Sequence, residues 1–322
     1  MHPGNHVTAY RIAADGTSVT AGVGDAGNDE SVQSYRWVHI HGPIGYLRAE
    51  LAALELPASV TDALTAEETR PRCTALGAGA IVILRGVNLN EGAEPEDMIS
   101  LRIWLAENLV VTCSLRPLRA VGDVTDMASH SRAPASPAAL VAAFAVRLAD
   151  RAEPVVAQLN EAVDAIEERM GEASLSEERR TLADTRRAAI LLRRYMFPQR
   201  DALTTLELEG FSWIGTTAQH GLREAVDRVT RLCEELDALR DRAQILQDQI
   251  MDERAETMNR QMLVLTIVAA FFLPIGFLTG LLGMNVGGVP LTESPFGFWI
   301  ICTLIAGVVG LEYVLFRIMR LI

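Results

Sequence analysis

The chain contains no lysine, and all 29 of its basic residues are arginine. A Walker A phosphate loop needs a lysine to reach the nucleotide phosphates, and Schiff-base catalysis needs a lysine amine. The sequence therefore predicts no nucleotide partner and no ATP-driven pump of the P-loop type. Cysteine is also scarce. The 4 cysteines form no CxxC pair, so neither a disulfide framework nor a zinc knuckle is expected.

Two further features bear on location and partners. Residues 1–27 hold no basic flank followed by an apolar core, so no secretory signal is expected. Together with the unpaired cysteines, this favours a soluble part in a reducing compartment. The formal net charge of -12 argues against a nucleic-acid partner and suits a protein that handles cations.

The apolar residues that are present gather at the C-terminal end. Residues 262–282 carry no charge and would span about 31 Å as a helix, which matches a hydrocarbon core of about 30 Å. Residues 296–316 form a second apolar segment, interrupted only by Glu312. The sequence therefore predicts an integral membrane protein in contact with lipid, with two transmembrane helices joined by the loop 283–295.

Arginine lies outside both ends of this hairpin and is missing from its loop. Arg254 and Arg260 precede the first segment, and Arg317 and Arg320 follow the second. By the positive-inside rule, both termini are expected in the cytoplasm and the loop on the outer side. The large N-terminal part is then cytoplasmic.

The remaining sequence predicts an α+β chain in which a small α/β domain precedes a helical bundle. Strand-like runs occur at 37–40, 80–84, 100–104 and 109–113, with helical spacing over 47–64 and a break at Pro57. The expected divisions are a flexible lead-in over 1–34, a cytoplasmic α/β domain over 35–128, a helical bundle and stalk over 129–260, and a transmembrane domain over 261–322.

The bundle is predicted to begin with Ser136 as N-cap and Pro137 as the first helical residue. No Pro or Gly interrupts 222–272, so one helix should cover at least this stretch, about 75 Å long. Its heptad stripe consists of Ala225, Val229, Leu232, Leu236, Leu239, Ala243, Leu246 and Ile250. The stripe fits packing inside one subunit and also a stalk that packs against copies of itself, and neither arrangement excludes the other.

Two helices cannot enclose a water-filled path. A transport pathway therefore needs an oligomer, most simply a cyclic one around a shared axis. The alternative is a membrane-tethered scaffold or sensor, in which the hairpin only anchors the cytoplasmic domain.

The end of the first membrane segment carries a motif that resembles a known family. Asn259 to Ile267 leads into Phe272-Leu273-Pro274 and Gly280, and the segment ends at Gly283-Met284-Asn285. Placed between two C-terminal helices, this triplet resembles the Gly-Met-Asn motif of the CorA superfamily of divalent-metal transporters. The resemblance covers most of the chain, because Leu192 to Arg194 and Pro198 to Asp201 resemble the cytoplasmic helical bundle of the family.

Within the superfamily, Asn285 to Pro290 and Met98 to Trp104 resemble the ZntB branch, which is associated with zinc. The magnesium branch usually has Tyr before the triplet and Phe after it, where this chain has Leu282 and Val286. The resemblance implies Zn²⁺ transport, with Mg²⁺, Co²⁺ or Ni²⁺ as alternatives. It also implies a homopentameric funnel in the inner membrane of a bacterium, with no bound cofactor and no enzymatic activity.

The resemblance further implies the site residues. Gly283, Met284 and Asn285 are the selectivity motif, and Asp248 matches an acidic position at the cytoplasmic mouth, although it fits a solvated heptad flank equally well. The implied pore-lining positions are Asn259, Met262, Leu265, Ala269, Leu273 and Gly276. Met262, Leu265 and Leu273 would form apolar constrictions that can gate by dewetting. Because Gly276 stands where the family often has a polar residue, no mid-membrane ion site follows from the resemblance.

A ring of Asn285 side chains, one per subunit, would present amide oxygens without a fixed charge. Such a ring can hold a hydrated dication through outer-shell hydrogen bonds and still release it. Amide oxygens are hard donors and do not by themselves favour zinc over magnesium. The residue chemistry thus leaves open the ion, the direction of transport and the choice between passive and proton-coupled flow.

Three other signals favour a structural interpretation. Gly22 to Gly27 matches GxGxxG but opens no helix, so it does not predict nucleotide binding. His39 and His41 alternate on one face of an expected strand, but a zinc site needs three or four ligands and no third lies nearby in sequence. Glu312 lies about one turn before Arg317, so its carboxylate can snorkel to the interface or pair with that arginine.

Overall fold

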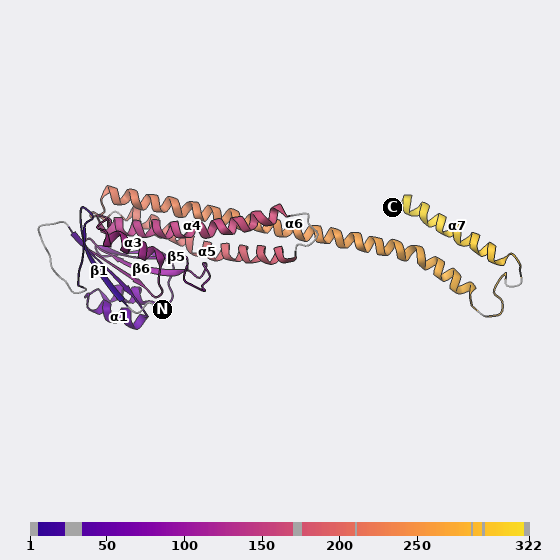
Figure 1. Ribbon diagram of the computed structural model, residues 1–322, viewed down its shortest axis with the longest axis horizontal. Helices are drawn as coiled ribbons and strands as arrows, with labels where there is room; N and C mark the ends of the chain where they lie inside the picture. Colours follow the sequence, from indigo (N-terminus) through magenta and orange to yellow (C-terminus); the bar gives the residue numbers. More distant parts are fainter. Residues whose placement is uncertain are drawn as a thin grey trace. The chain divides into compact units, whose positions relative to one another are not determined.

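The computed structural model describes residues 6–22, 34–169, 176–209, 211–284, 286–291 and 294–318, and Figure 1 labels most of its helices and some of its strands. The chain divides into two compact units, residues 1–247 and 248–322. The first unit contains the sheet and most of the helices, and the second contains the two apolar segments.

A mixed sheet forms the centre of the first unit. Its strands are β1 (His6–Ala13), β2 (Ser18–Thr20), β3 (Ser34–His41), β4 (Arg72–Leu76), β5 (Gly79–Gly86), β6 (Ile99–Leu105) and β7 (Leu109–Ser114). Within the described ranges, the strand order is β2-β1-β3-β7-β6-β5-β4, and β3 and β7 are its parallel pair. The strand-like runs predicted from sequence lie in β3, β5, β6 and β7, which confirms them.

The first two strands correct the expectation of a flexible lead-in over residues 1–34. β1 pairs with β3 along its whole length, from His6 opposite His41 to Ala13 opposite Ser34. Ile12 is fully buried, although the segment is polar on average. A strand can bury the side chains of one face even where the segment is polar on average, and average composition does not reveal this alternation. Residues 23–33, which hold most of the GxGxxG match, lie outside the described residues.

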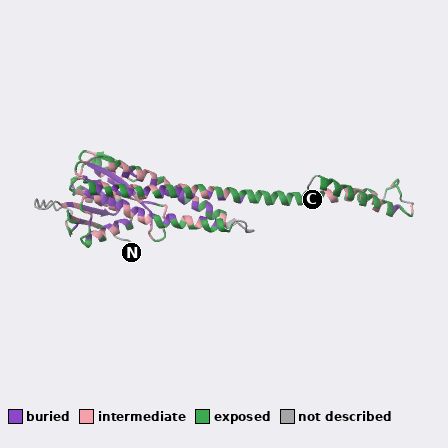
Figure 2. Cartoon of the chain, turned by 90° about the horizontal axis from the view of Figure 1, so that it is seen from above, coloured by how far each residue is buried: buried purple, intermediate pink, exposed green. Residues whose placement is uncertain are grey.

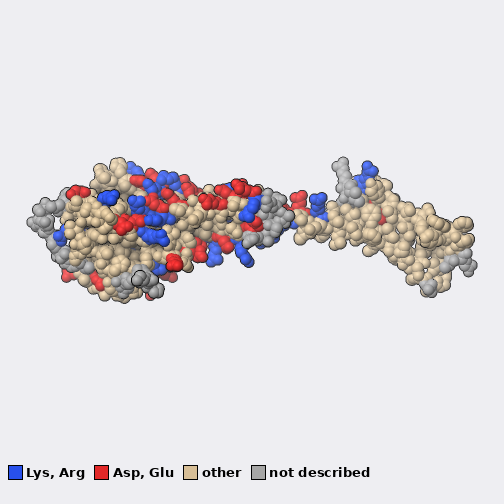
Figure 3. Space-filling view, in the orientation of Figure 1, with Lys and Arg blue, Asp and Glu red and all other residues tan. Residues whose placement is uncertain are grey.

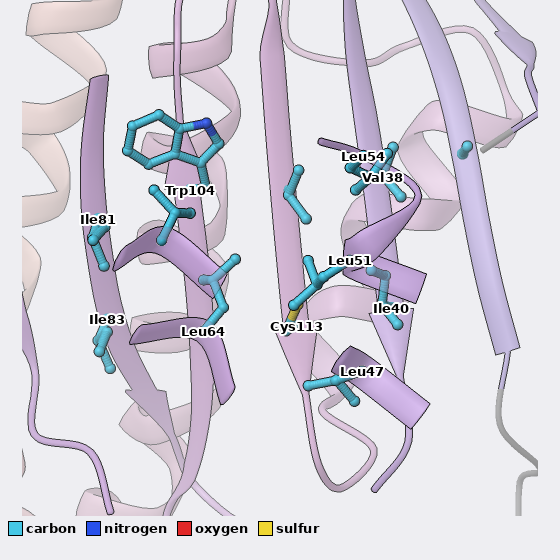
Figure 4. Close-up of a cluster of buried hydrophobic side chains, with 13 residues drawn as sticks. Val38, Ile40, Leu47, Leu51, Leu54, Leu64, Ile81, Ile83, Trp104 and Cys113 are labelled. Atoms are coloured by element: carbon cyan, nitrogen blue, oxygen red, sulfur yellow. The ribbon is translucent and has the colours of Figure 1, made fainter. Parts of the chain in front are cut away.

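One face of the sheet is covered by α1 (Ile44–Ala52) and α2 (Ala58–Thr65). Pro57 immediately precedes α2, so the predicted helical spacing is split into two helices. Figure 4 shows Leu47, Leu51 and Leu64 of these helices over the strands that carry Ile40 and Ile83. This cluster of buried side chains is the hydrophobic core on that face.

The other face is covered by α3 (Arg119–Ser129), α4 (Pro137–Glu168) and α5 (Ser176–Leu208). Phe144 of α4 meets Trp37 of β3 edge-on, with ring centroids 5.6 Å apart. The start of α4 confirms the prediction, since Ser136 Oγ accepts a hydrogen bond from the backbone N–H of Ala139 at 3.2 Å.

The long helix α6 (Thr216–Leu282) includes the whole stretch predicted to be unbroken. Every position of its heptad stripe is buried in the single chain. Ion pairs connect α6 to the two neighbouring helices. Arg228 Nη1 lies 2.5 Å from Asp150 Oδ1 of α4. Asp237 Oδ1 lies 2.5 Å from Arg193 Nε of α5. Figure 2 shows the buried inner sides of these helices. The stripe therefore belongs to the interior of one subunit, and copies of the chain would have to meet on other surfaces.

The second unit contains the remainder of α6 and α7 (Gly297–Ile318). Both helices are long and apolar enough to cross a membrane. Figure 3 shows charged side chains crowded over the first unit and sparse over these apolar segments. Charge is expensive inside a bilayer, so this distribution suits two transmembrane helices.

Candidate ion pathway

One face of α6 in the second unit packs on α7. Ile267, Phe271, Ile275 and Leu278 are partly covered along this face. Phe271 meets Phe316 of α7 edge-on, with ring centroids 5.2 Å apart. The spacing of three and four residues places these side chains in one stripe along the helix.

The predicted pore positions lie on the opposite face of α6, and all of them are exposed in the single chain. The exposed fractions are 56% for Met262, 69% for Leu265 and 74% for Leu273. At about 100° per residue, the positions from Asn259 to Gly276 fall within an arc of about 120°, centred roughly opposite the stripe that packs on α7. The structure thus brings these residues together on one uncovered helix face.

The C-terminal end of α6 accounts for the glycine of the triplet. The N–H of Gly283 donates to the carbonyl oxygen of Thr279 at 2.9 Å. A Cβ at position 283 would lie 2.8 Å from that same oxygen, so a side chain here would displace the end of the helix. Met284 is 48% exposed. Asn285, the predicted ion-contacting residue, lies outside the described residues.

One polar residue on the uncovered face was missed by the spacing argument. Thr266 falls on the same side of α6 as Met262 and Leu273, and its Oγ1 donates to the carbonyl oxygen of Met262 at 2.8 Å. A hydroxyl that donates its hydrogen still has two lone pairs with which to accept. The signal in the sequence was a threonine within an otherwise apolar run.

Asp248 is exposed and lies on the same side of α6 as Met262 by helical spacing. Its carboxylate forms part of the acidic, solvated stretch that precedes the apolar residues. Both interpretations made from sequence, a position at the mouth of the pathway and a solvated flank, are compatible with this placement.

Glu312 does not form the ion pair with Arg317 that the sequence allowed. Among the residues that the structure describes, its Oε2 is buried and has no hydrogen-bond partner. Glu312 lies one turn before Phe316, the residue that contacts α6, and is itself partly covered. Its carboxyl group therefore lies on the side of α7 that faces α6.

His39 and His41 are buried in the sheet, with 3% and 5% of their surface exposed. Nδ1 of His39 lies 2.9 Å from Thr112 Oγ1, and Nδ1 of His41 lies 3.2 Å from Ser114 Oγ. Burial lowers the pKa of His39 to about 3. As the side chains stand in the described part of the chain, no group of three or more His, Cys, Asp or Glu could hold a metal ion.

Comparison with known proteins gives a consistent set of relatives. The family described as "CorA-like Mg2+ transporter protein" matches residues 32–317. The chain is 40% identical over 261 residues to the divalent cation transporter CmaX of Pseudomonas aeruginosa, covering 80% of this chain and 79% of that protein. It is 32% identical over 305 residues to the zinc transport protein ZntB of Pectobacterium atrosepticum, covering 94% and 92%. The solved structure of full-length CmaX matches with a TM-score of 0.82 at 36% identity, covering 99% of each chain.

Proposed function

Because the chain belongs to the CorA superfamily of divalent-cation transporters, and within it to the ZntB branch, we propose that it carries Zn²⁺ along the axis of a cyclic homo-oligomer. The observation that carries this proposal is the uncovered face of α6. A face that met only lipid would gain nothing from polar side chains, because these are costly in hydrocarbon. Thr266 nevertheless lies on this face within the apolar segment, beside Ala269 and Gly276.

Assembly of several copies follows from the same geometry. The described part of one chain supplies two apolar helices. Two helices cannot surround water, so α6 helices from several subunits would have to meet around an axis. The heptad stripe is buried and unavailable for this purpose. A Cβ placed at Gly276 or Gly280 meets nothing within 4 Å, which leaves room for the helix of a neighbouring subunit to approach closely. By resemblance to the family, the assembly is a pentamer shaped as a funnel.

Along this axis, the ion would meet different chemistry at each level. Asn285 would form an oxygen ring at the outer mouth and hold the hydrated ion through its water shell. Met262, Leu265 and Leu273 would form apolar constrictions that exclude water when closed. Asp248 would attract cations at the inner mouth. Transport by this route requires no catalytic group and no resident cofactor.

Zinc is proposed as the ion because the ZntB relatives are named as zinc transport proteins. The second candidate is a channel for Mg²⁺, Co²⁺ or Ni²⁺. It is favoured by the oxygen donor of Asn285, since hard oxygen ligands suit Mg²⁺ at least as well as Zn²⁺. Uptake under imposed pH gradients distinguishes passive from proton-coupled flow.

The orientation proposed for the membrane domain rests on arginine. Arg254 and Arg260 lie before the apolar part of α6, and Arg317 lies in the last turn of α7. By the positive-inside rule, these ends and the sheet domain are cytoplasmic, in the inner membrane of a bacterium.

Transport is tested by reconstituting the purified chain in liposomes that contain a zinc-sensitive dye. We expect the dye to respond to external Zn²⁺ faster than in empty liposomes, under at least one of several imposed pH gradients. A response equal to that of empty liposomes under every gradient would leave the chain as a membrane-tethered scaffold or sensor.

Ion selectivity is tested in the same liposomes by competition. Mg²⁺, Co²⁺ and Ni²⁺ are added in turn at rising concentration against a fixed concentration of Zn²⁺. We expect Mg²⁺ to compete poorly. If Mg²⁺ abolishes zinc uptake with an apparent affinity close to that for Zn²⁺, the chain is a channel of the magnesium type.

A further inference from the structure

Three histidines from two neighbouring strands lie together at one end of the sheet. His6, the first residue of β1, is directly opposite His41 of β3 in the antiparallel register. His39 lies two residues before His41 and therefore on the same face of the strand. The ring centroids of His6 and His41 are 5.2 Å apart, and those of His6 and His39 are 6.2 Å apart. The third histidine was hidden from sequence reasoning because more than thirty residues separate it from the other two.

These separations are close to those of imidazoles that share one metal ion. A tetrahedral zinc site with Zn–N bonds of 2.0–2.1 Å places the centres of two imidazole rings about 5 Å apart. The pair His6 and His41 is already at this separation, and the pair His6 and His39 is about 1 Å longer. His6 is exposed at the end of its strand, whereas the other two are buried. Metal binding would require the side chains to move from these positions, and His6 is the one of the three that lies at the surface.

Hydrogen bonding determines which nitrogen of His39 is available. The hydroxyl of Thr112 accepts a hydrogen bond from Trp37 Nε1 at 2.9 Å and donates its only hydrogen to the carbonyl oxygen of Val38 at 3.4 Å. His39 Nδ1, 2.9 Å from this hydroxyl, must then donate to it. The lone pair of the ring is consequently on Nε2, the nitrogen through which it can bind a metal.

His41 repeats the arrangement two residues further along the same strands. In the parallel register of β3 and β7, His39 faces Thr112 and His41 faces Ser114. Nδ1 of His41 lies 3.2 Å from the Ser114 hydroxyl. Metal-binding histidines are commonly held in place by such a hydrogen bond at the second ring nitrogen.

We propose that His6, His39 and His41 form a binding site for a borderline divalent cation such as Zn²⁺ or Co²⁺, with water as the fourth ligand. Three imidazoles suit these ions and do not suit Mg²⁺, which requires oxygen ligands. All three histidines belong to the first unit, whereas the proposed pore positions belong to the second. The site does not rest on the proposed transport function.

The test uses the full-length protein in detergent, stripped of metal with a chelator and titrated with Co²⁺. Tetrahedral Co²⁺ absorbs visible light much more strongly than the octahedral hydrated ion that an outer-shell oxygen ring would hold. We expect one strongly absorbing Co²⁺ per subunit, displaced by equimolar Zn²⁺ and unaffected by excess Mg²⁺. His6→Ala should abolish this band, and His220→Ala, which changes an exposed histidine of α6, should leave it intact.

A second variant separates metal binding from folding. Ser114→Ala keeps all three ligands but removes the hydroxyl that orients His41, and should weaken Co²⁺ binding by about 10-fold or more. Far-ultraviolet circular dichroism checks that each variant is folded. The proposal is overturned if the unaltered chain gives no tetrahedral band, or if a folded His6→Ala variant retains it. Liposome transport and this spectrum are measured independently, so failure of one proposal does not imply failure of the other.

Discussion

Truncation of Leu236 tests whether the heptad stripe belongs to the interior of one subunit. Leu236 is 0% exposed in the single chain, and the neighbouring Asp237 pairs with Arg193 of α5. Leu236→Ala removes buried methyl groups and leaves a cavity, which costs about 2–5 kcal/mol when the surroundings relax only in part. Ile245→Ala on the same helix is the matched control. Because Ile245 is 58% exposed, its truncation should cost within about 0.5 kcal/mol.

The expected effect is a large fall in melting temperature for one variant and a small one for the other. For a domain of this size, 1 kcal/mol corresponds to about 2–4 °C, so Leu236→Ala should melt roughly 10 °C lower. Intrinsic tryptophan fluorescence follows the melting of the purified protein in detergent. Measurements at two protein concentrations that differ about tenfold add a second criterion, because the stability lost on truncating a side chain inside one subunit does not depend on concentration.

Two results would refute the reasoning. If Leu236→Ala melts at the same temperature as the unaltered protein, the stripe is not a packed core. If its loss of stability grows on dilution, the stripe lies between copies of the chain, and the packing against α4 and α5 is not what stabilises α6.

Asn285→Ala should abolish most zinc uptake in liposomes while the oligomer still elutes at its normal size in gel filtration, because water can replace the amide at the proposed outer mouth and no buried group would lose a partner. Asn285→Asp should bind dications more tightly and release them poorly. A normal uptake rate in the Asn285→Ala variant would refute the proposed role of Asn285 at the outer mouth. Leu265→Ser should raise the basal ion leak of the liposomes by hydrating the constriction, whereas Leu304→Ser on α7 should not. Equal leak in both variants would show that the uncovered face of α6 is not the pathway. Glu312→Leu should leave uptake intact and the melting temperature equal or higher, because it removes a buried carboxyl oxygen that lacks a partner. A selective loss of pH-dependent uptake would instead assign Glu312 to the transport path.

The parts of the fold that sequence predicted best are those governed by local periodicity. The helix start at Ser136 and the break at Pro57 rest on cap and ring chemistry within a few residues, and the structure contains both. The apolar segments were recognisable because a bilayer demands a long run without charge. The strand at His6–Ala13 was missed because a short, polar strand is stabilised by its partner β3, which lies beyond a long connection.

The candidate site divides in the same way. The family resemblance implied the positions from Asn259 to Gly276, and helical spacing predicted that they share one face, since the geometry of an α-helix follows from sequence position alone. It did not indicate which side of α6 packs on α7, which depends on the contact between Phe271 and Phe316. Nor did it indicate whether Glu312 would reach Arg317, because both arrangements satisfy the same spacing.

The sequence by itself determined the class of the protein: two long apolar segments, a Gly-Met-Asn triplet between them, and a charged helical region before them. Each of these features depends on residues that are close together in the sequence. Helix geometry and the apolar run that a bilayer requires can therefore be recognised without the tertiary structure. Only the tertiary structure decided that the heptad stripe is buried within one subunit, and that His6 lies beside His39 and His41. Those outcomes depend on which distant segments exclude water together, and strand pairing brings together residues whose separation in sequence carries no signal of contact.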